Sequence, residues 1–414
     1  MLKIKLFALI LFGISAFSQT KVLYNQSVEA YKSKDYVLFL KLTKQLDSIR
    51  PMHPTFAYNL ASAYSLNGEK EESLRVLKTV ILANNTINFE GDSDFDAIKN
   101  EKGFKDLLEM KVSQSKIIES SKEKFSLSEK DLHPEGLLYL EKHKRWLSSS
   151  IRNKKVVSFD EKGNCSDWFT DCLYSVFAIK ADFNEKYLWI TCSAIPEMKG
   201  FSKEMEGKSE ILKIDIATRK LVKRYTIEGN HVFGDLVITK NNDVYISDSA
   251  EAIIYKIENE SLALWKDLRK EAFNLQGITL NTNESKIFIA DYLKGILAID
   301  IKSEKENWFE FPDNASQKGI DGLVFYNNSL IAIQNGVMPI RIVRYRLNES
   351  QTKIVDFTIL DNNRKVFDEP ALATLVKNKI YFFANSPWKF YDKNGQLDES
   401  KFENPKLFEL ILEK

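Results

Sequence analysis

The feature that most constrains this fold is a short strand-like pattern that recurs six times between positions 146 and 384. Each copy is a run of mainly apolar residues, and most copies end in a small, acidic or amide residue. Successive copies begin 42, 56, 43, 43 and 50 residues apart, near the repeat length of a propeller blade. The copies are WLSSS at Trp146, LWITC at Leu188, VYISD at Val244, IFIAD at Ile287, LIAIQ at Leu330 and IYFFA at Ile380.

Residues 275–311 show what one repeat contains, because four alternating apolar runs are separated there by Asn, Ser, Glu, Lys and Gly. Such a run of four antiparallel strands is marginal alone and needs copies of itself to pack against. We therefore predict an all-β six-bladed β-propeller over residues 125–414. We expect FSLSE, from Phe125, to close the ring by pairing with the C-terminal KLFELILEK.

The segment 19–110 has helical rather than strand periodicity. Its pattern resembles a short tetratricopeptide array, with Gly68 at a turn between two helices and a closing helix from Asp92. Residues 111–124 are polar and are predicted to be a helix end and a linker. The fold class is thus a helical-repeat domain followed by the propeller. The helical part is either a groove for a partner peptide or a structural cap.

Residues 1–18 combine Lys3 and Lys5, an apolar run and Ala16-Phe17-Ser18, which is the pattern of a secretory signal peptide. The apolar run is too short for a membrane span, so the mature chain is predicted to be exported, periplasmic or secreted, without an integral membrane segment. Of the three cysteines, Cys192 is expected in the core. Cys165 and Cys172 either pair across two blades or stay free.

The charge is balanced, with 59 Lys and Arg against 58 Asp and Glu. Nothing in this balance indicates a nucleic-acid or anionic-membrane partner, because either would need a concentrated basic surface. The sequence also has no Gly-rich phosphate loop, no Cys/His zinc cluster and no GxSxG nucleophile motif.

Polar residues recur at one end of the predicted strands, where the first strand of each blade begins and the second ends. Entry residues and second-strand ends share one face of a propeller, so these oxygens would converge there and suit a divalent cation, Ca²⁺ first. The alternative for each residue is an ordinary turn cap. The entries supply Glu135, Asp235, Gln276, Asp321 and Glu369, and the second-strand ends supply Asp248, Asp291, Gln334, Asn335, Asn385 and Ser386.

Three stretches resemble one known family, the SMP-30, gluconolactonase and strictosidine synthase-like six-bladed propellers: the PEGLLY stretch, LQGITLNTNESKIFIAD and GIDGLVF. The resemblance covers residues 125–414. It implies a divalent cation held by Glu135 and Asp321, with Asp321 also acting as the base in lactone hydrolysis. One expected Asn ligand is Gln276 here, and another position is Phe233, which cannot bind a metal.

Two functions remain open from the sequence. The first is a metal-dependent hydrolase of a small lactone or ester, with Glu135, Gln276 and Asp321 on the metal and His231 or His133 moving protons. The second is a binding protein without chemistry, whose propeller takes a small molecule and whose helical repeats take a protein partner. In both, the further ligand contacts are expected from Asp235, Asn335, Glu369 and Asn385, with Arg341 and Trp388 on the same face.

Overall fold

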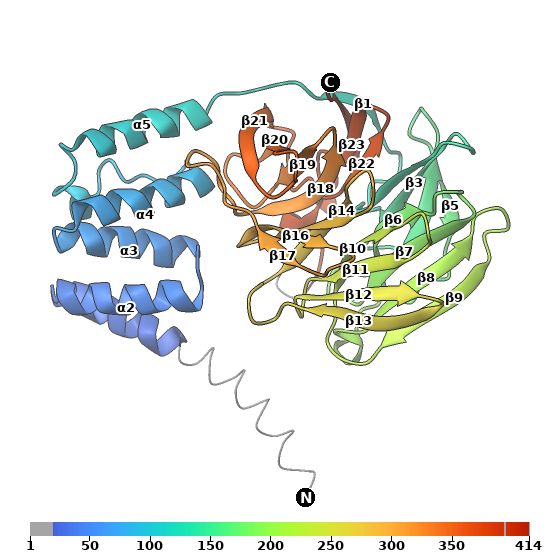
Figure 1. The fold of residues 1–414 in the computed structure, drawn as a ribbon, viewed down its shortest axis with the longest axis horizontal. Coiled ribbons are helices and arrows are strands. Elements are labelled where there is room, and N and C mark those ends of the chain that lie inside the picture. Colours follow the sequence, from blue (N-terminus) through green and yellow to red (C-terminus); the bar gives the residue numbers. More distant parts are fainter. Residues whose placement is uncertain (1–19, 393–394, 414) are drawn as a thin grey trace, which may run out of the picture. The chain divides into compact units, whose positions relative to one another are not determined.

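The computed structural model describes residues 20–392 and 395–413. The predicted signal peptide lies outside these residues. The chain divides into two compact units, residues 1–116 and 117–414. In Figure 1 the first unit is blue to cyan and the second runs from green to red. Within the described part, no helix is long and apolar enough to cross a membrane.

The first unit is helical, and its consecutive helices pack against one another. Asp35 caps the second helix by accepting a hydrogen bond from the Leu38 amide at 3.0 Å, and Pro54 begins the third. A buried cluster that includes Ala61 and Leu77 fills the space between the helices. The helical segments are residues 20–32, α2 (Tyr36–Ile49), α3 (Pro54–Leu66), α4 (Lys70–Ala83) and α5 (Lys102–Gln114).

The closing helix predicted from Asp92 is shorter than expected, because a 3-10 turn, Ser93–Phe95, and non-helical residues precede α5. Side chains of α3 hold this turn. Tyr58 donates a hydrogen bond to Asp92 at 2.6 Å, and Ser62 donates one to Asp94 at 2.5 Å. These bonds hold the two carboxylates against α3, and they favour the short turn over a continuous helix from Asp92.

The second unit contains six four-stranded antiparallel sheets, as the repeat predicts. The first strand of each sheet contacts the first strands of its two neighbours, and the contact between the first and last blades closes the ring. The first blade contains β2 (Leu137–Leu140), β3 (Arg145–Ser150), β4 (Lys155–Phe159) and β5 (Cys165–Phe169), and the second contains β6 (Ser175–Ala181), β7 (Tyr187–Ser193), β8 (Ser209–Asp215) and β9 (Leu221–Ile227). The third contains β10 (Phe233–Ile238), β11 (Val244–Asp248), β12 (Ile253–Glu258) and β13 (Ser261–Asp267), and the fourth contains β14 (Leu275–Leu280), β15 (Lys286–Asp291), β16 (Gly295–Asp300) and β17 (Glu306–Trp308). The fifth contains β18 (Ile320–Tyr326), β19 (Ser329–Gln334), β20 (Arg341–Leu347) and β21 (Ile354–Asn362), and the sixth contains β22 (Ala373–Val376), β23 (Lys379–Phe383), β24 (Lys406–Ile411) and β1 (Lys122–Ser126).

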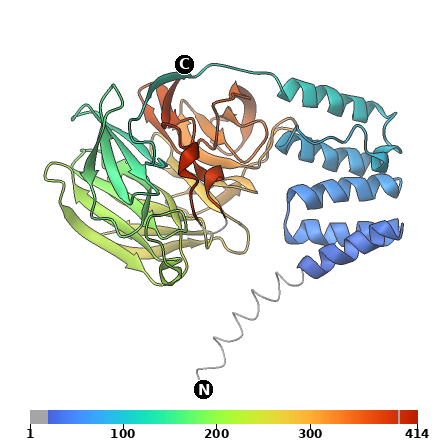
Figure 2. The same ribbon diagram turned by 180° about the vertical axis from the view of Figure 1, so that it is seen from behind.

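The ring closes by the predicted antiparallel pairing with the C-terminal strand β24, but the closing strand is β1, which begins at Lys122, within the predicted linker, and ends at Ser126. Between β23 and β24 the chain makes a long connection with two short 3-10 helices, η3 (Trp388–Phe390) and η4 (Glu399–Lys401), which are red in Figure 2. Closure thus gives the last blade its fourth strand.

The recurring pattern coincides with the second strands, which are almost wholly buried; β19, for example, has six buried residues of six. These strands lie between the faces of neighbouring blades, so both sides of each strand need apolar residues. Cys192, in β7, is 0% exposed, as predicted. The alternative pairing of Cys165 with Cys172 is not formed. All three thiols are free, and Cys172 packs in the same apolar cluster as Cys192.

Candidate functional site

The five polar entry residues line one cavity of about 400 Å³. They come from five different blades and are joined there by Asn274, Tyr292, Asn335 and Trp388. The structure therefore brings together in one cavity five residues that the sequence placed on one face. The five are Glu135, Asp235, Gln276, Asp321 and Glu369.

Three of these entry residues lie at irregularities of strand pairing. The register shifts between Phe233 and Asp235, between Leu275 and Ile278, and between Ile320 and Gly322. A bulge turns a side chain away from the regular alternation, and here it turns Asp235, Gln276 and Asp321 toward the cavity.

Glycine beside the polar residue permits this close packing. A Cβ atom on Gly277 would lie 2.5 Å from the carbonyl oxygen of Asp321, and one on Gly322 would overlap the carbonyl oxygen of Ala371. Neighbouring first strands thus approach more closely than other residues would allow. In the recurring pairs Gln276-Gly277 and Asp321-Gly322, the first residue supplies the polar side chain and the glycine permits the close approach of the neighbouring strand.

In three blades a hydroxyl group on the second strand accepts a hydrogen bond from a backbone amide in or next to the first strand. The backbone amides of Gly136, Ala178 and Asp235 donate hydrogen bonds to Ser149 (2.6 Å), Thr191 (3.0 Å) and Ser247 (3.2 Å), respectively. Sequence reasoning missed this device. Its signal is a Ser or Thr within an otherwise apolar second strand.

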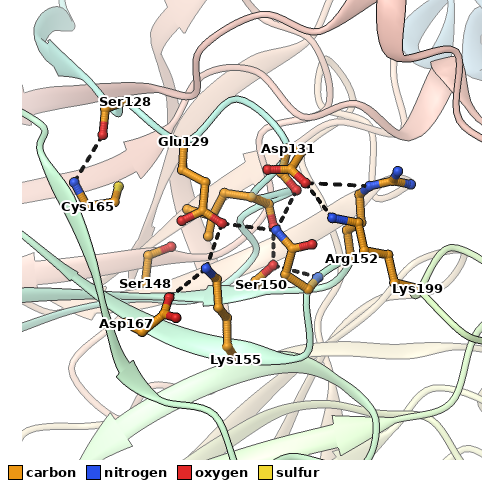
Figure 3. A network of polar contacts seen from close by, with 12 residues as sticks. Ser128, Glu129, Asp131, Ser148, Ser150, Arg152, Lys155, Cys165, Asp167 and Lys199 are labelled. Carbon is orange, nitrogen blue, oxygen red and sulfur yellow. Dashed lines mark hydrogen bonds and ion pairs between the residues drawn. The ribbon is translucent and has the colours of Figure 1, made fainter.

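The segment that precedes Glu135 is anchored by polar contacts to its own blade and to the second blade (Figure 3). Lys155 contacts Glu129 at 2.8 Å and Asp167 at 2.6 Å. Lys199 contacts Asp131 at 2.6 Å. These ion pairs fix a segment without regular secondary structure just before the polar entry residue.

Asp321 has one hydrogen-bond donor among the described residues, the Asn335 amide at 2.5 Å. Tyr292 in turn donates to the Asn335 oxygen at 3.0 Å, which orients the amide. Burial raises the pKa of Asp321 to about 7; the Asn335 bond opposes this rise, and the charges of Glu369 and Asp235 add to it. Asp321 is therefore a partly neutral carboxyl group near neutral pH.

Glu135 also has few partners. Its side chain interacts with Trp388, and its buried Oε2 atom accepts no hydrogen bond from the described residues. Burial raises the pKa of Glu135 well above its usual range, and Asp321 and Glu369 raise it further. Burial also raises the pKa of Glu369. The cavity thus concentrates carboxyl groups that disfavour one another's charge.

Asp235 is bonded differently. Its two oxygens accept hydrogen bonds from the backbone amides of Leu236 at 2.9 Å and Ile278 at 3.1 Å, and Lys180 lies 3.7 Å away. The second bond comes from the bulge of the next blade. Burial raises the pKa of Asp235, while Lys180 and the two amides oppose the rise.

The acidic second-strand ends act as turn caps. Asp291 accepts four backbone hydrogen bonds, from residues 273, 274, 293 and 294. Asp248 accepts bonds from residues 232 and 250 and contacts His231 Nδ1 at 2.6 Å. Neither carboxylate lines the cavity, which fits the alternative that strand-end Asp residues satisfy backbone groups.

Several other predicted residues also lie away from this cavity. His231 contacts Asp248 and the Glu228 carbonyl oxygen through its two ring nitrogens and stacks on the buried Phe233. Arg341 is buried and donates to Gln334 at 2.9 Å. Asn385 bonds the backbone of residues 404 and 406 and borders a second cavity.

His133 is also buried beside the second cavity, where its Nδ1 lies 2.8 Å from the Tyr391 hydroxyl. Burial lowers its pKa to about 3, and Arg152 lowers it further. A neutral ring with this partner is an anchored side chain rather than a proton carrier to Asp321.

No protein-family model matches the chain, and no curated protein matches it. Solved structures do match. One is a gluconolactonase from Xanthomonas campestris, with 11% sequence identity and a TM-score of 0.47, and the match covers 71% of this chain and 89% of the gluconolactonase chain. A streptogramin B lyase matches with 16% sequence identity and a TM-score of 0.48, and the match covers 71% of this chain and 97% of the lyase chain. A virginiamycin B lyase from Staphylococcus aureus matches with 14% sequence identity and a TM-score of 0.46, and the match covers 71% of this chain and 99% of the lyase chain. These likenesses concern the fold, and the function is inferred below from the cavity.

Proposed function

We propose that the acidic cavity binds a divalent cation, Ca²⁺ first, and hydrolyses a small ester or lactone. The observation that supports this is the convergence of oxygen-bearing side chains from five blades. They include a buried Glu135 oxygen that has no hydrogen-bond donor in the part of the chain that the structure describes. Buried carboxyl groups that raise one another's pKa are stabilised in their ionised form by a bound cation.

Glu135, Asp321 and the side-chain oxygen of Gln276 would hold the cation. The Gln276 nitrogen donates to Asn274, so its oxygen is available as a ligand. In the described part of the chain no three His, Cys, Asp or Glu side chains form a metal-binding group. Amide oxygens would therefore have to complete the shell, which suits a hard cation with oxygen ligands. A bound cation polarises a substrate carbonyl.

Asp321 would accept the proton of the attacking water. A carboxyl group whose pKa lies near neutrality is suited to proton transfer at neutral pH. Asn335 holds this carboxylate from one side, and Tyr292 holds Asn335, so the base has a defined orientation. His231 takes no part in this proposal, because its ring nitrogens contact Asp248 and a backbone carbonyl.

The test is a screen of lactones and aryl esters with the full chain, first in chelator and then with Ca²⁺, Mg²⁺ or Mn²⁺. We expect turnover that requires the cation and is lost in Asp321→Asn. Asp171→Asn, at an exposed position on a loop of the same unit, is the matched control and should keep full activity. Equal rates in chelator and in Ca²⁺, or an active Asp321→Asn protein, would contradict the proposal.

A binding protein without chemistry is the second candidate. It is favoured by the three aromatic side chains that line the cavity beside the carboxyl groups, Phe177, Tyr292 and Trp388. Aromatic faces and carboxylates together suit an organic cation. In that case an amine-containing ligand, rather than Ca²⁺, would raise the melting temperature, and no ester would be turned over.

Export and a peptide partner for the helical unit stay predictions. N-terminal sequencing of protein from the producing cell tests export, since cleavage after Ser18 would leave Gln19 first. Retention of Met1 on the purified protein would contradict it.

A further inference from the structure

A second cavity, of about 340 Å³, lies beside the acidic one. The two cavities are neighbours, because residues next to each other in the sequence line different cavities. Asp368 lines the second cavity and Glu369 the first, while Lys389 lines the second and Trp388 the first. The second cavity lies wholly within the propeller unit.

The charge of this second cavity is opposite to that of the first. Of its four lysines, Lys389 pairs with Asp368 at 2.8 Å and Lys406 with Glu403 at 3.1 Å. Within residues 20–392 and 395–413, the structure gives the other two lysines no ion-pair partner. These two unpaired cations at the rim are Lys130 and Lys365.

Two buried side chains of the lining have a polar atom without a hydrogen-bond partner in the described part of the chain. They are the Ser386 hydroxyl and the Nε2 atom of His133, on residues that are 6% and 0% exposed. A buried polar group without a partner is costly and commonly marks a bound ligand or ion. Both observations are independent of the lysines.

The neighbours of His133 indicate which nitrogen carries the proton. The positive charge of the Arg152 guanidinium acts on the Tyr391 hydroxyl, which favours an oxygen lone pair toward Arg152 and the hydroxyl proton away from it. The Tyr391 proton is then free to point at His133 Nδ1, 2.8 Å away. That order places the ring proton on Nε2, so the unpartnered atom is a donor. The Ser386 hydroxyl can donate as well.

We propose that the second cavity binds an oxyanion, either a carboxylate or a phosphate. Its lining offers ammonium groups from Lys130 and Lys365 and neutral donors from His133 and Ser386, and anionic oxygens accept from all of these. The first cavity disfavours the same ligand because its lining is acidic. The proposal does not depend on hydrolysis in the first cavity.

The test is calorimetric titration of the full chain with inorganic phosphate and, separately, with acetate, at matched low ionic strength and neutral pH. We expect saturable binding of at least one anion. The double variant Lys130→Gln/Lys365→Gln should bind about tenfold more weakly or worse, because it removes two charged donors. Phosphate binding alone would identify a phosphate site, and acetate binding alone a carboxylate site.

The matched control is Lys162→Gln/Lys220→Gln, which removes the same charge from exposed positions in turns between strands. It should bind as the unmodified protein does. Ser386→Ala, which leaves the charge unchanged, should also weaken binding, and this separates a built site from general attraction. Absence of saturable binding of either anion, or equal affinity in the two double variants, would overturn the proposal.

Discussion

Asp235 and Asp321 occupy equivalent entry positions in the third and fifth blades, and their surroundings differ. Asp235 accepts two backbone hydrogen bonds and has a lysine nearby, so it joins one blade to the next. Asp321 accepts one side-chain bond and faces other carboxyl groups. The difference teaches that position in the repeat brings a carboxylate to the cavity, while its partners decide whether it is a structural or a ligand-binding group.

The largest expected effect separates the two aspartates by activity. Asp321→Asn should lower turnover by about 10²–10⁴-fold, because it removes a base while keeping the shape of the side chain. The melting temperature should not fall, since a carboxyl group that is costly to ionise is replaced by a neutral amide. Steady-state kinetics and a thermal melt on the same sample measure both. Unchanged turnover would make Asp321 a structural residue like Asp235.

The second effect concerns stability. Asp235→Asn should lower the free energy of unfolding by about 1–3 kcal/mol, because an amide nitrogen would face a backbone N–H donor. Chemical denaturation measures this change. A protein as stable as the unmodified one would mean that the bonds to Leu236 and Ile278 are not what holds these blades together.

The third effect is the response to Ca²⁺. Added Ca²⁺ should raise the melting temperature above that in chelator, because a ligand that binds only the folded state stabilises it. Glu135→Gln should reduce the shift and Asp235→Asn should largely keep it. No shift in the unmodified protein would remove the metal from the proposal.

The smallest expected effect is the pH dependence of stability without metal. The pKa of Asp321 is raised from 3.8 to about 7, so between these values the unfolded chain releases this proton and the folded chain retains it. The contribution of Asp321 is therefore fully present below pH 4 and is lost as pH rises toward 7. Asp321→Asn should flatten this part of the profile, measured by denaturation at several pH values. A steeper profile in the variant would contradict the raised pKa.

The sequence was sufficient to predict the blades and the five entry residues that line the acidic cavity. Second strands buried on both faces, such as β15 and β19, must be apolar, and that requirement repeats visibly along the chain. Closure by β1 followed from the need to cover the free edge. Entry residues such as Gln276 were found because equivalent positions of a ring share one face.

The partners of each polar residue could not be predicted, because they come from other blades through bulges and long-range packing. Asp235 accepts a hydrogen bond from the backbone amide of Ile278, in the next blade. His231 contacts the carboxylate of Asp248, at the end of a strand. A bulge changes which way a side chain points without changing the repeat pattern. The sequence therefore grouped His231 and Asn385 with the cavity residues, whereas neither lines the acidic cavity.

The most direct measurement is the titration of the Asp321 carboxyl group by carbon NMR, with labelled aspartate and with Asp321→Asn to assign the signal. In chelator we expect this carboxyl group to titrate with a pKa near 7, and with saturating Ca²⁺ we expect its pKa to fall toward the usual range. A pKa at or below the usual value of aspartate in chelator would show that Asp321 is as well paired as Asp235. The distinction between the two carboxylates, and the hydrolase proposal with it, would then be wrong.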